Sequence, residues 1–112
     1  MYPKGYTNSM ITLLQTTEFG DWLRELKDNI GKARILARLR SASLGHFGDS
    51  KPVGSGILEM RIHAGPGYRV YFARRGETVY LLRCGGDKAT QAADIKRARS
   101  ILKSLPPEAP HD

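Results

Sequence analysis

Apolar and polar side chains alternate along residues 57–75, on both sides of a Gly-Pro-Gly sequence. A period of two residues is typical of a half-buried antiparallel strand, so this stretch predicts a β-hairpin. The residues of its apolar face are Leu58, Met60, Ile62, Tyr68, Val70 and Phe72. Those of the opposite face are Arg61, His63, Arg69 and Tyr71, with Glu59 at the edge. The pattern therefore predicts a core on one face of the hairpin and a basic patch on the other.

Helical spacing follows a short strand in the first part of the chain. An apolar run at residues 10–15 predicts that strand, and Thr16 or Thr17 follows as a helix N-cap. Apolar residues then recur with the i, i+3, i+4, i+7 spacing of an amphipathic helix, at Phe19, Trp22, Leu23 and Leu26. Gly31 interrupts the pattern, and a second helix is predicted from about residue 32 to residue 43. The two helices are expected to form a helical hairpin.

The remaining elements complete an α+β fold. Residues 44–56 are rich in Gly, Ser and Pro and predict a loop. Residues 78–84 predict a third consecutive strand after the β-hairpin, and Thr90 is expected to cap a last helix that ends at Pro106. The order is then strand, helix, helix, three strands, helix. It predicts a small antiparallel sheet with the helical hairpin packed on one face.

Domain organisation follows from length and from the two ends. A chain of 112 residues has the size of one domain with a single core. Residues 1–9 and 106–112 carry Pro, Gly and polar residues without a periodic pattern. We therefore expect a flexible leader, a single domain at residues 10–105, and a flexible tail.

Positive charge is concentrated in the predicted second helix. The chain has a formal net charge of +7. Lys32, Arg34, Arg38 and Arg40 occur in a stretch, 31–48, that contains no acidic residue. Such an excess can serve solubility alone, but basic residues grouped in one segment favour a polyanionic partner. We therefore expect Lys32, Arg34 and Arg38 to contact a nucleic-acid backbone.

Two observations exclude membrane and secreted classes. The apolar runs are only a few residues long, far short of the ~20 residues that cross a bilayer. The single cysteine, Cys84, can form neither an internal disulfide nor a cysteine-based zinc site. The sequence therefore predicts a cytoplasmic protein.

Three stretches carry a resemblance to a known family. They read FGDWLRELKD, ARILARLRSASLGHFGDSKPVGSGILEMRIHAGPGYRVYFARRG and LLRCGGDKATQAADIKRA. With them the chain resembles the RelE/ParE superfamily of type II toxin–antitoxin toxins, and most closely its HigB-like branch. The resemblance implies a compact RelE-like domain that cleaves messenger RNA in the ribosomal A site without a metal ion or other cofactor. It also implies a co-encoded antitoxin, with a helix-turn-helix DNA-binding region, that silences the toxin.

The resemblance implies roles for individual basic residues. Arg69 falls where the family places an arginine that contacts phosphate, Arg61 is the basic residue of the preceding strand, and Lys88 is the basic residue of the turn after the last strand. Arginine suits a phosphate because its planar fork binds two oxygens and stays charged. His63 is a candidate for proton transfer, since an imidazole gives and takes a proton near neutral pH. Tyr71 is a candidate to stack on an RNA base.

Two other functions stay open at this point. ParE-like members of the superfamily bind DNA gyrase and block it, and a degenerate toxin would retain only antitoxin binding. The tyrosine or histidine that some RelE relatives use for acid–base chemistry aligns near Asp94, and between Tyr80 and His111 the chain contains neither residue type. This departure favours the alternatives. The clustered basic residues of the predicted hairpin and turn favour the nuclease.

Overall fold

A computed structural model describes residues 11–106 of the chain. The predicted leader, and the predicted tail beyond Pro106, lie outside the described residues. The elements are β1 (Thr12–Gln15), α1 (Thr17–Glu25), α2 (Asn29–Ser43), β2 (Ser50–Gly54), β3 (Ile57–Ile62), β4 (Tyr68–Arg75), β5 (Thr78–Gly85), the short 3₁₀ helix η2 (Lys88–Thr90) and α3 (Gln91–Ser104). The predicted α+β class is confirmed. None of the helices in residues 11–106 is long and apolar enough to cross a bilayer.

The sheet has five strands in the order β1-β5-β4-β3-β2. β1 pairs with β5 in parallel, and the other neighbours pair antiparallel. The loop predicted for residues 44–56 is wrong for part of that segment, because Ser50–Gly54 form an edge strand, β2, beside β3. An edge strand tolerates a proline, since one side of its backbone has no strand neighbour. Pro52 is therefore compatible with this strand, although a proline in the sequence favours a loop.

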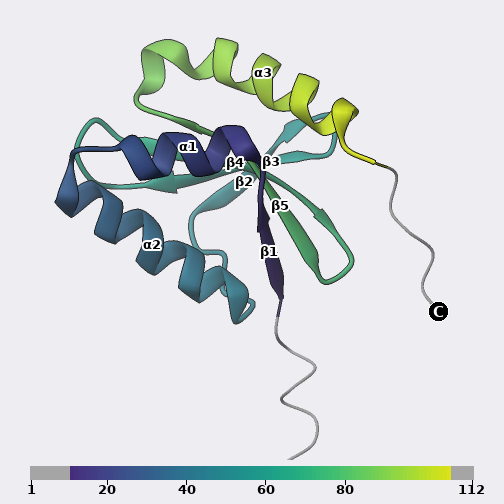
Figure 1. Ribbon diagram of the computed structural model, residues 1–112, viewed down its shortest axis with the longest axis horizontal. Coiled ribbons are helices and arrows are strands. Elements are labelled where there is room, and N and C mark those ends of the chain that lie inside the picture. Colours follow the sequence, from purple (N-terminus) through teal and green to yellow (C-terminus); the bar gives the residue numbers. More distant parts are fainter. Residues whose placement is uncertain (1–10, 107–112) are drawn as a thin grey trace, which may run out of the picture.

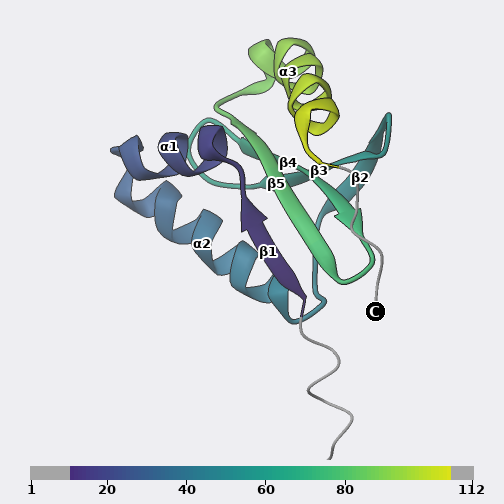
Figure 2. The same ribbon diagram turned by 45° about the vertical axis from the view of Figure 1, so that its right-hand side comes forward.

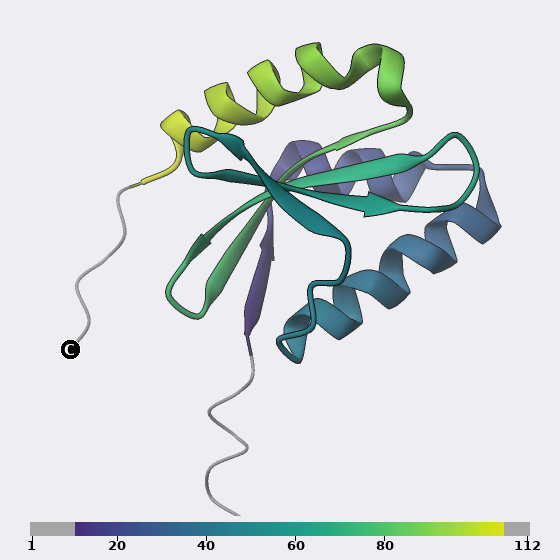
Figure 3. The same cartoon turned by 180° about the vertical axis from the view of Figure 1, so that it is seen from behind.

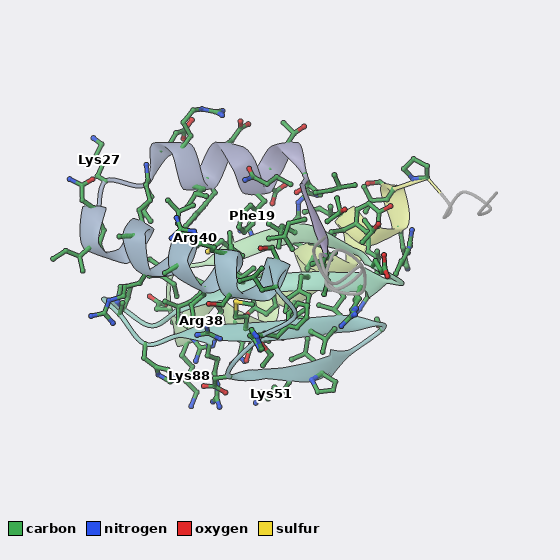
Figure 4. All side chains as sticks on the ribbon, turned by 90° about the horizontal axis from the view of Figure 1, so that it is seen from below. Phe19, Lys27, Arg38, Arg40, Lys51 and Lys88 are labelled. Carbon is green, nitrogen blue, oxygen red and sulfur yellow. The ribbon has the colours of Figure 1, made fainter. Side chains whose placement is uncertain are left out.

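The helices cover both faces of the sheet (Figures 1 and 2). Helices α1 and α2 pack on the face predicted to be apolar, where Phe19 and Ile35 are fully buried against the strands. Phe19 points from α1 toward the sheet (Figure 4). Helix α3 covers part of the opposite face, where Ala98 and Ile101 pack on β4 and β5. Helix α3 thus covers the part of the hairpin's predicted polar face that holds Tyr71. The edge strand β2 lies in the foreground of Figure 3.

Local chemistry explains where the first two helices begin. The Thr16 hydroxyl accepts a hydrogen bond from the amide of Phe19 at 3.2 Å, so the predicted N-cap is confirmed. Helix α2 begins after Asp28, whose carboxylate accepts from the amide of Gly31 at 2.9 Å. The prediction that Gly31 separates the two helices is wrong, because Gly31 lies within the first turn of α2. A Cβ atom there would come within 2.5 Å of Tyr68, so glycine permits a close approach between α2 and β4.

Candidate functional site

Strand register brings the two predicted phosphate ligands to neighbouring positions. Arg61 of β3 lies opposite Arg69 of β4, and Arg69 lies opposite Gly85 of β5. Side chains of opposed residues share one face of a sheet. Lys88 follows three residues after Gly85, is exposed, and lies on the side of the molecule turned away from α1 (Figure 4). Strand pairing therefore brings Arg61 and Arg69 together at this end of the sheet, and Lys88 follows in the 3₁₀ helix η2 just after β5.

Two carboxylates offset the repulsion between the opposed arginines. Like charges directly opposite one another destabilise a sheet. The guanidinium Nη2 of Arg61 lies 3.0 Å from Asp49 Oδ1, and the Arg69 Nε lies 3.7 Å from Glu59 Oε2. Each arginine thus has a carboxylate of its own, and the two pairs differ greatly in exposure.

The Arg61 pair is open to solvent and includes the predicted proton-transfer residue. The Arg61 side chain is 42% exposed, and the Nε2 atom of His63 lies 2.8 Å from Asp49 Oδ2. The hydrogen bond from Arg61, and to a smaller extent the one from His63, holds the pKa of Asp49 below its usual value. One ionised carboxylate therefore fixes a guanidinium and an imidazole side by side. Asp49 was not among the site residues predicted from the sequence, although it is the one acidic residue in the stretch 29–58.

The Arg69 pair is largely buried. The Arg69 side chain is 14% exposed, and Glu59 is completely buried. The Oε2 atom of Glu59 also accepts hydrogen bonds from Tyr71 at 3.1 Å and from Gln91 of α3 at 2.6 Å. Its Oε1 atom has no hydrogen-bond partner among the described residues. Glu59, expected at the edge of an exposed patch, is instead a buried anion that Arg69 partly neutralises.

Tyr71 does not reach the surface. Alternation correctly places it on the same face as Arg69, but α3 covers it and its exposed fraction is 0%. Burial, and to a smaller extent the negative charge of Glu59, raises the pKa of its phenol. The prediction that Tyr71 stacks on a base is wrong for this structure, because no part of the ring is accessible.

The three basic residues expected on α2 have different surroundings. Arg38 extends toward the strands (Figure 4) and donates to two backbone oxygens, of Arg61 at 2.6 Å and of Phe47 at 2.9 Å. Lys32 donates to the carbonyl of Arg24 at 3.3 Å. The side chain of Arg34 is exposed and makes no hydrogen bond or ion pair within residues 11–106. Arg34 and Arg38 line a small cleft of about 250 Å³ together with His63. The basic surface of α2 is thus continuous with the end of β3.

Asp94 has a structural position. It is 2% exposed, and its carboxylate accepts hydrogen bonds from Arg83 at 3.0 Å and from the Thr90 hydroxyl at 2.7 Å. A Cβ atom on Gly85 would lie 2.3 Å from its Oδ2 atom, so the backbone of β5 passes directly against this carboxylate. Thr90 stands at the predicted N-cap, but its hydroxyl bonds to Asp94 in place of a backbone amide. These contacts fasten the start of α3 to β5.

A larger cleft of about 630 Å³ lies elsewhere, between the start of α1 and the last turns of α3. Glu18 and Asp21 are among its lining residues, together with Arg97. Hydrogen bonds from Arg97 and Arg83 keep the pKa of Glu18 below its usual value, in spite of partial burial. Two carboxylates at its rim disfavour an RNA backbone there. Its size therefore does not make it the candidate site.

Metal and thiol chemistry receive no support from the described residues. Within residues 11–106, no three His, Cys, Asp or Glu side chains are grouped closely enough to hold a metal ion. Cys84 is buried, and burial raises the pKa of its thiol, which disfavours the reactive thiolate.

The chain is similar to one known family and to a protein from another organism. Residues 21–105 match the family described as phage derived protein Gp49-like (DUF891). An uncharacterized protein of Haemophilus influenzae is 44% identical over 95 residues, which cover 85% of this chain and 96% of that relative. No solved structure matches the chain significantly.

Proposed function

Because this chain belongs to the phage-derived Gp49-like family, a family of RelE-like toxins, we propose that it is the toxin of a type II toxin–antitoxin system. We propose further that it cleaves messenger RNA on the ribosome without a metal ion, and that it falls in the HigB-like branch. The partner in this proposal is a co-encoded antitoxin with a helix-turn-helix region, and the compartment is the cytoplasm. The cleavage centre is the end of the β3–β4–β5 sheet.

One observation carries this proposal: Arg61 lies directly opposite Arg69. Two opposed guanidinium groups are unfavourable for folding alone, but they suit a phosphate that gains negative charge during cleavage. Arg61 is exposed enough to contact the RNA directly. No described residue hydrogen-bonds to the Nη2 atom of Arg69, while Nη1 donates to the carbonyl of Gly67 at 3.2 Å. A phosphate could thus bind between the two side chains.

The proposed reaction needs a base, an acid and charge stabilisation around one phosphate. The ribose 2′-oxygen forms a bond to phosphorus as its proton passes to a base, and the bond from phosphorus to the 5′-oxygen breaks. The leaving oxygen takes up a proton, which leaves a 2′,3′-cyclic phosphate and a 5′-hydroxyl. In this proposal Arg61 and Arg69 stabilise the phosphorane, His63 is the base, and Lys88 supplies the second proton.

A ParE-like gyrase inhibitor is the second candidate. The observation that favours it is the position of Asp94, near which some RelE relatives carry an acid–base Tyr or His. Asp94 is buried and fully engaged in holding α3, so it cannot take over that function. The nuclease proposal therefore depends on His63 and Lys88 for both proton transfers.

Induced expression followed by mapping of transcript 5′ ends separates these candidates. The nuclease proposal predicts growth arrest with new 5′ ends inside translated codons, lost in Arg61→Ala and kept in Arg24→Ala. Arg24 is a matched control because it also pairs with an exposed aspartate, Asp21, on α1. DNA damage signalling with intact transcripts would decide for gyrase. Unimpaired growth with soluble protein would decide for a degenerate toxin.

A further inference from the structure

The carboxylate of Asp49 joins two groups that the proposed reaction uses. Its Oδ2 atom lies 2.8 Å from the Nε2 atom of His63, and its Oδ1 atom accepts a hydrogen bond from Arg61 at 3.0 Å. We propose that Asp49 is a positioning residue, which holds His63 in the tautomer and orientation of a general base beside the phosphate-binding Arg61. This inference rests on the proposed nuclease function and adds to it a residue and a proton path.

The tautomer follows from the chemistry of the pair. An ionised carboxylate accepts hydrogen bonds and donates none, so the Nε2 atom of a neutral His63 must carry the proton. Its Nδ1 atom then has a free lone pair, as a base requires. The lowered pKa of Asp49 keeps the carboxylate ionised at neutral pH. Asp49 thus leaves one nitrogen of His63 able to take the 2′-hydroxyl proton.

The backbone holds Asp49 rigidly enough for this task. Its carbonyl oxygen accepts a hydrogen bond from the amide of Arg61 at 2.9 Å. The next residue, Ser50, begins β2 and pairs with Met60. Asp49 is therefore connected to β3 through both its main chain and its side chain. A positioning residue needs this kind of support, because catalysis is sensitive to displacements of about 1 Å.

The other charged residues that line the cleft around His63 are cationic. Arg34 and Arg38 of α2 line the cleft that contains His63, and Arg61 shares its carboxylate. Arg69 lies across from Arg61 and is neutralised by Glu59. Asp49 is the carboxylate that contacts His63. Its removal would leave the imidazole among arginines, without a partner to orient it.

In the proposed step, Nδ1 of His63 takes the proton of the 2′-hydroxyl as the 2′-oxygen bonds to phosphorus. The bond from phosphorus to the 5′-oxygen then breaks, and the leaving oxygen takes its proton from Lys88. The imidazolium that forms on His63 faces the Asp49 carboxylate, which stabilises its positive charge. Asp49 itself gains and loses no proton.

Three variants test the inference: Asp49→Asn, Asp49→Glu and, as a matched control, Asp21→Asn in the exposed pair with Arg24. Cleavage of mRNA on purified ribosomes would be measured over a range of pH, together with ¹⁵N NMR of His63 in the free protein at alkaline pH. We expect Asp49→Asn to lower kcat at least about tenfold with little change in KM, as for a misplaced general base. The pH profile should change with it, and Asp49→Glu should restore part of the rate. The wild type should show the Nε2–H tautomer, and Asp49→Asn a mixture.

Each possible result of these measurements either supports the inference or contradicts it. A wild type that cleaves, an Asp49→Asn variant that cleaves equally well and an unchanged tautomer would overturn the inference while leaving the nuclease proposal intact. A wild type that does not cleave would overturn both. An equal loss of activity in Asp21→Asn, or a lower Tm for Asp49→Asn, would mean that the loss of activity comes from impaired folding. Either result would contradict a positioning role, since an exposed ion pair adds little stability.

Discussion

The guanidinium of Arg69 lies 3.7 Å from the carboxylate of Glu59, between Nε and Oε2, and that carboxylate is completely buried. Removing one partner of a buried ion pair leaves an uncompensated charge, which is more costly than the pair itself is stabilising. Arg69 therefore has a structural task in addition to any contact with a phosphate. A loss of toxicity in an Arg69 variant has to be separated from a loss of folding.

Arg69→Ala is expected to lower the free energy of unfolding by about 2 kcal/mol, because Glu59 keeps its bonds to Tyr71 and Gln91 but loses its cation. Chemical denaturation measures this change. The double variant Arg69→Ala/Glu59→Gln should recover part of the loss, since a neutral amide needs no counter-ion. Arg74→Ala, on the same strand but exposed, is the control and should stay within about 0.5 kcal/mol of wild type. A double variant no more stable than Arg69→Ala would refute the ion-pair explanation.

Gly85→Ala should destabilise the protein by about 2 kcal/mol, because the new methyl group would collide with the buried carboxylate of Asp94. The adjacent Gly86 gives a matched control, since a Cβ atom there meets no atom within 4 Å. Thermal unfolding of the two variants would show a lower Tm for Gly85→Ala alone. Equal Tm values would mean that α3 is not packed against β5 in this way.

Tyr68 makes stability sensitive to alkaline pH. Burial, together with the hydrogen bond that its hydroxyl donates to Asp28 at 2.7 Å, raises the pKa of Tyr68 from 10.0 to about 12. Below pH 10 the phenol is neutral in both states, so its contribution is complete. Between pH 10 and about 12 only the unfolded state loses the proton, so the contribution is lost as pH rises.

Tyr68→Phe should therefore be less stable than wild type at neutral pH, and the difference should shrink above pH 10. Urea denaturation at several pH values measures this difference. Tyr80→Phe is a suitable control, because the Tyr80 hydroxyl makes no hydrogen bond within residues 11–106. A stability difference that stays constant up to about pH 12 would contradict the assigned pKa.

Association with the antitoxin should depend on salt. The chain carries a net charge of +7, so an acidic or amphipathic antitoxin segment would meet a complementary field. The association rate, measured by stopped flow, should fall as salt rises from low to physiological concentration. A rate indifferent to salt would argue against an electrostatic encounter.

The period-two pattern predicted the hairpin and the residues on each of its faces. Met60, Val70 and Phe72 alternate with other residues along the strands, so all three point to the same side of the sheet and share one core. The pattern cannot show what covers the second face. Tyr71 and Glu59 lie on that face as predicted, yet α3 buries them. Long-range packing of α3 decides their exposure, and no local signal reports it.

The basic residues of the candidate site could be named from the sequence, but the contacts that join them to other residues could not. Strand alternation placed Arg61 and Arg69 on one face, and the family resemblance singled out Lys88. Asp49 lies in a glycine-rich segment interpreted as a loop, so nothing placed it beside His63. Strand β2 was missed for the same reason, because Pro52 and Gly54 hide an edge strand from propensity alone.

Above all, we propose that the cationic centre around Arg61 cleaves RNA through the 2′-hydroxyl. The most direct test of this claim is end-group analysis of mRNA fragments, produced in a single turnover on purified ribosomes. Wild type and Arg24→Ala should give 5′-hydroxyl ends and 2′,3′-cyclic phosphates, and Arg61→Ala should cleave about 100-fold more slowly at an unchanged Tm. Intact mRNA, fragments with 5′-phosphate ends, or an Arg61→Ala protein as fast as wild type would contradict the claim.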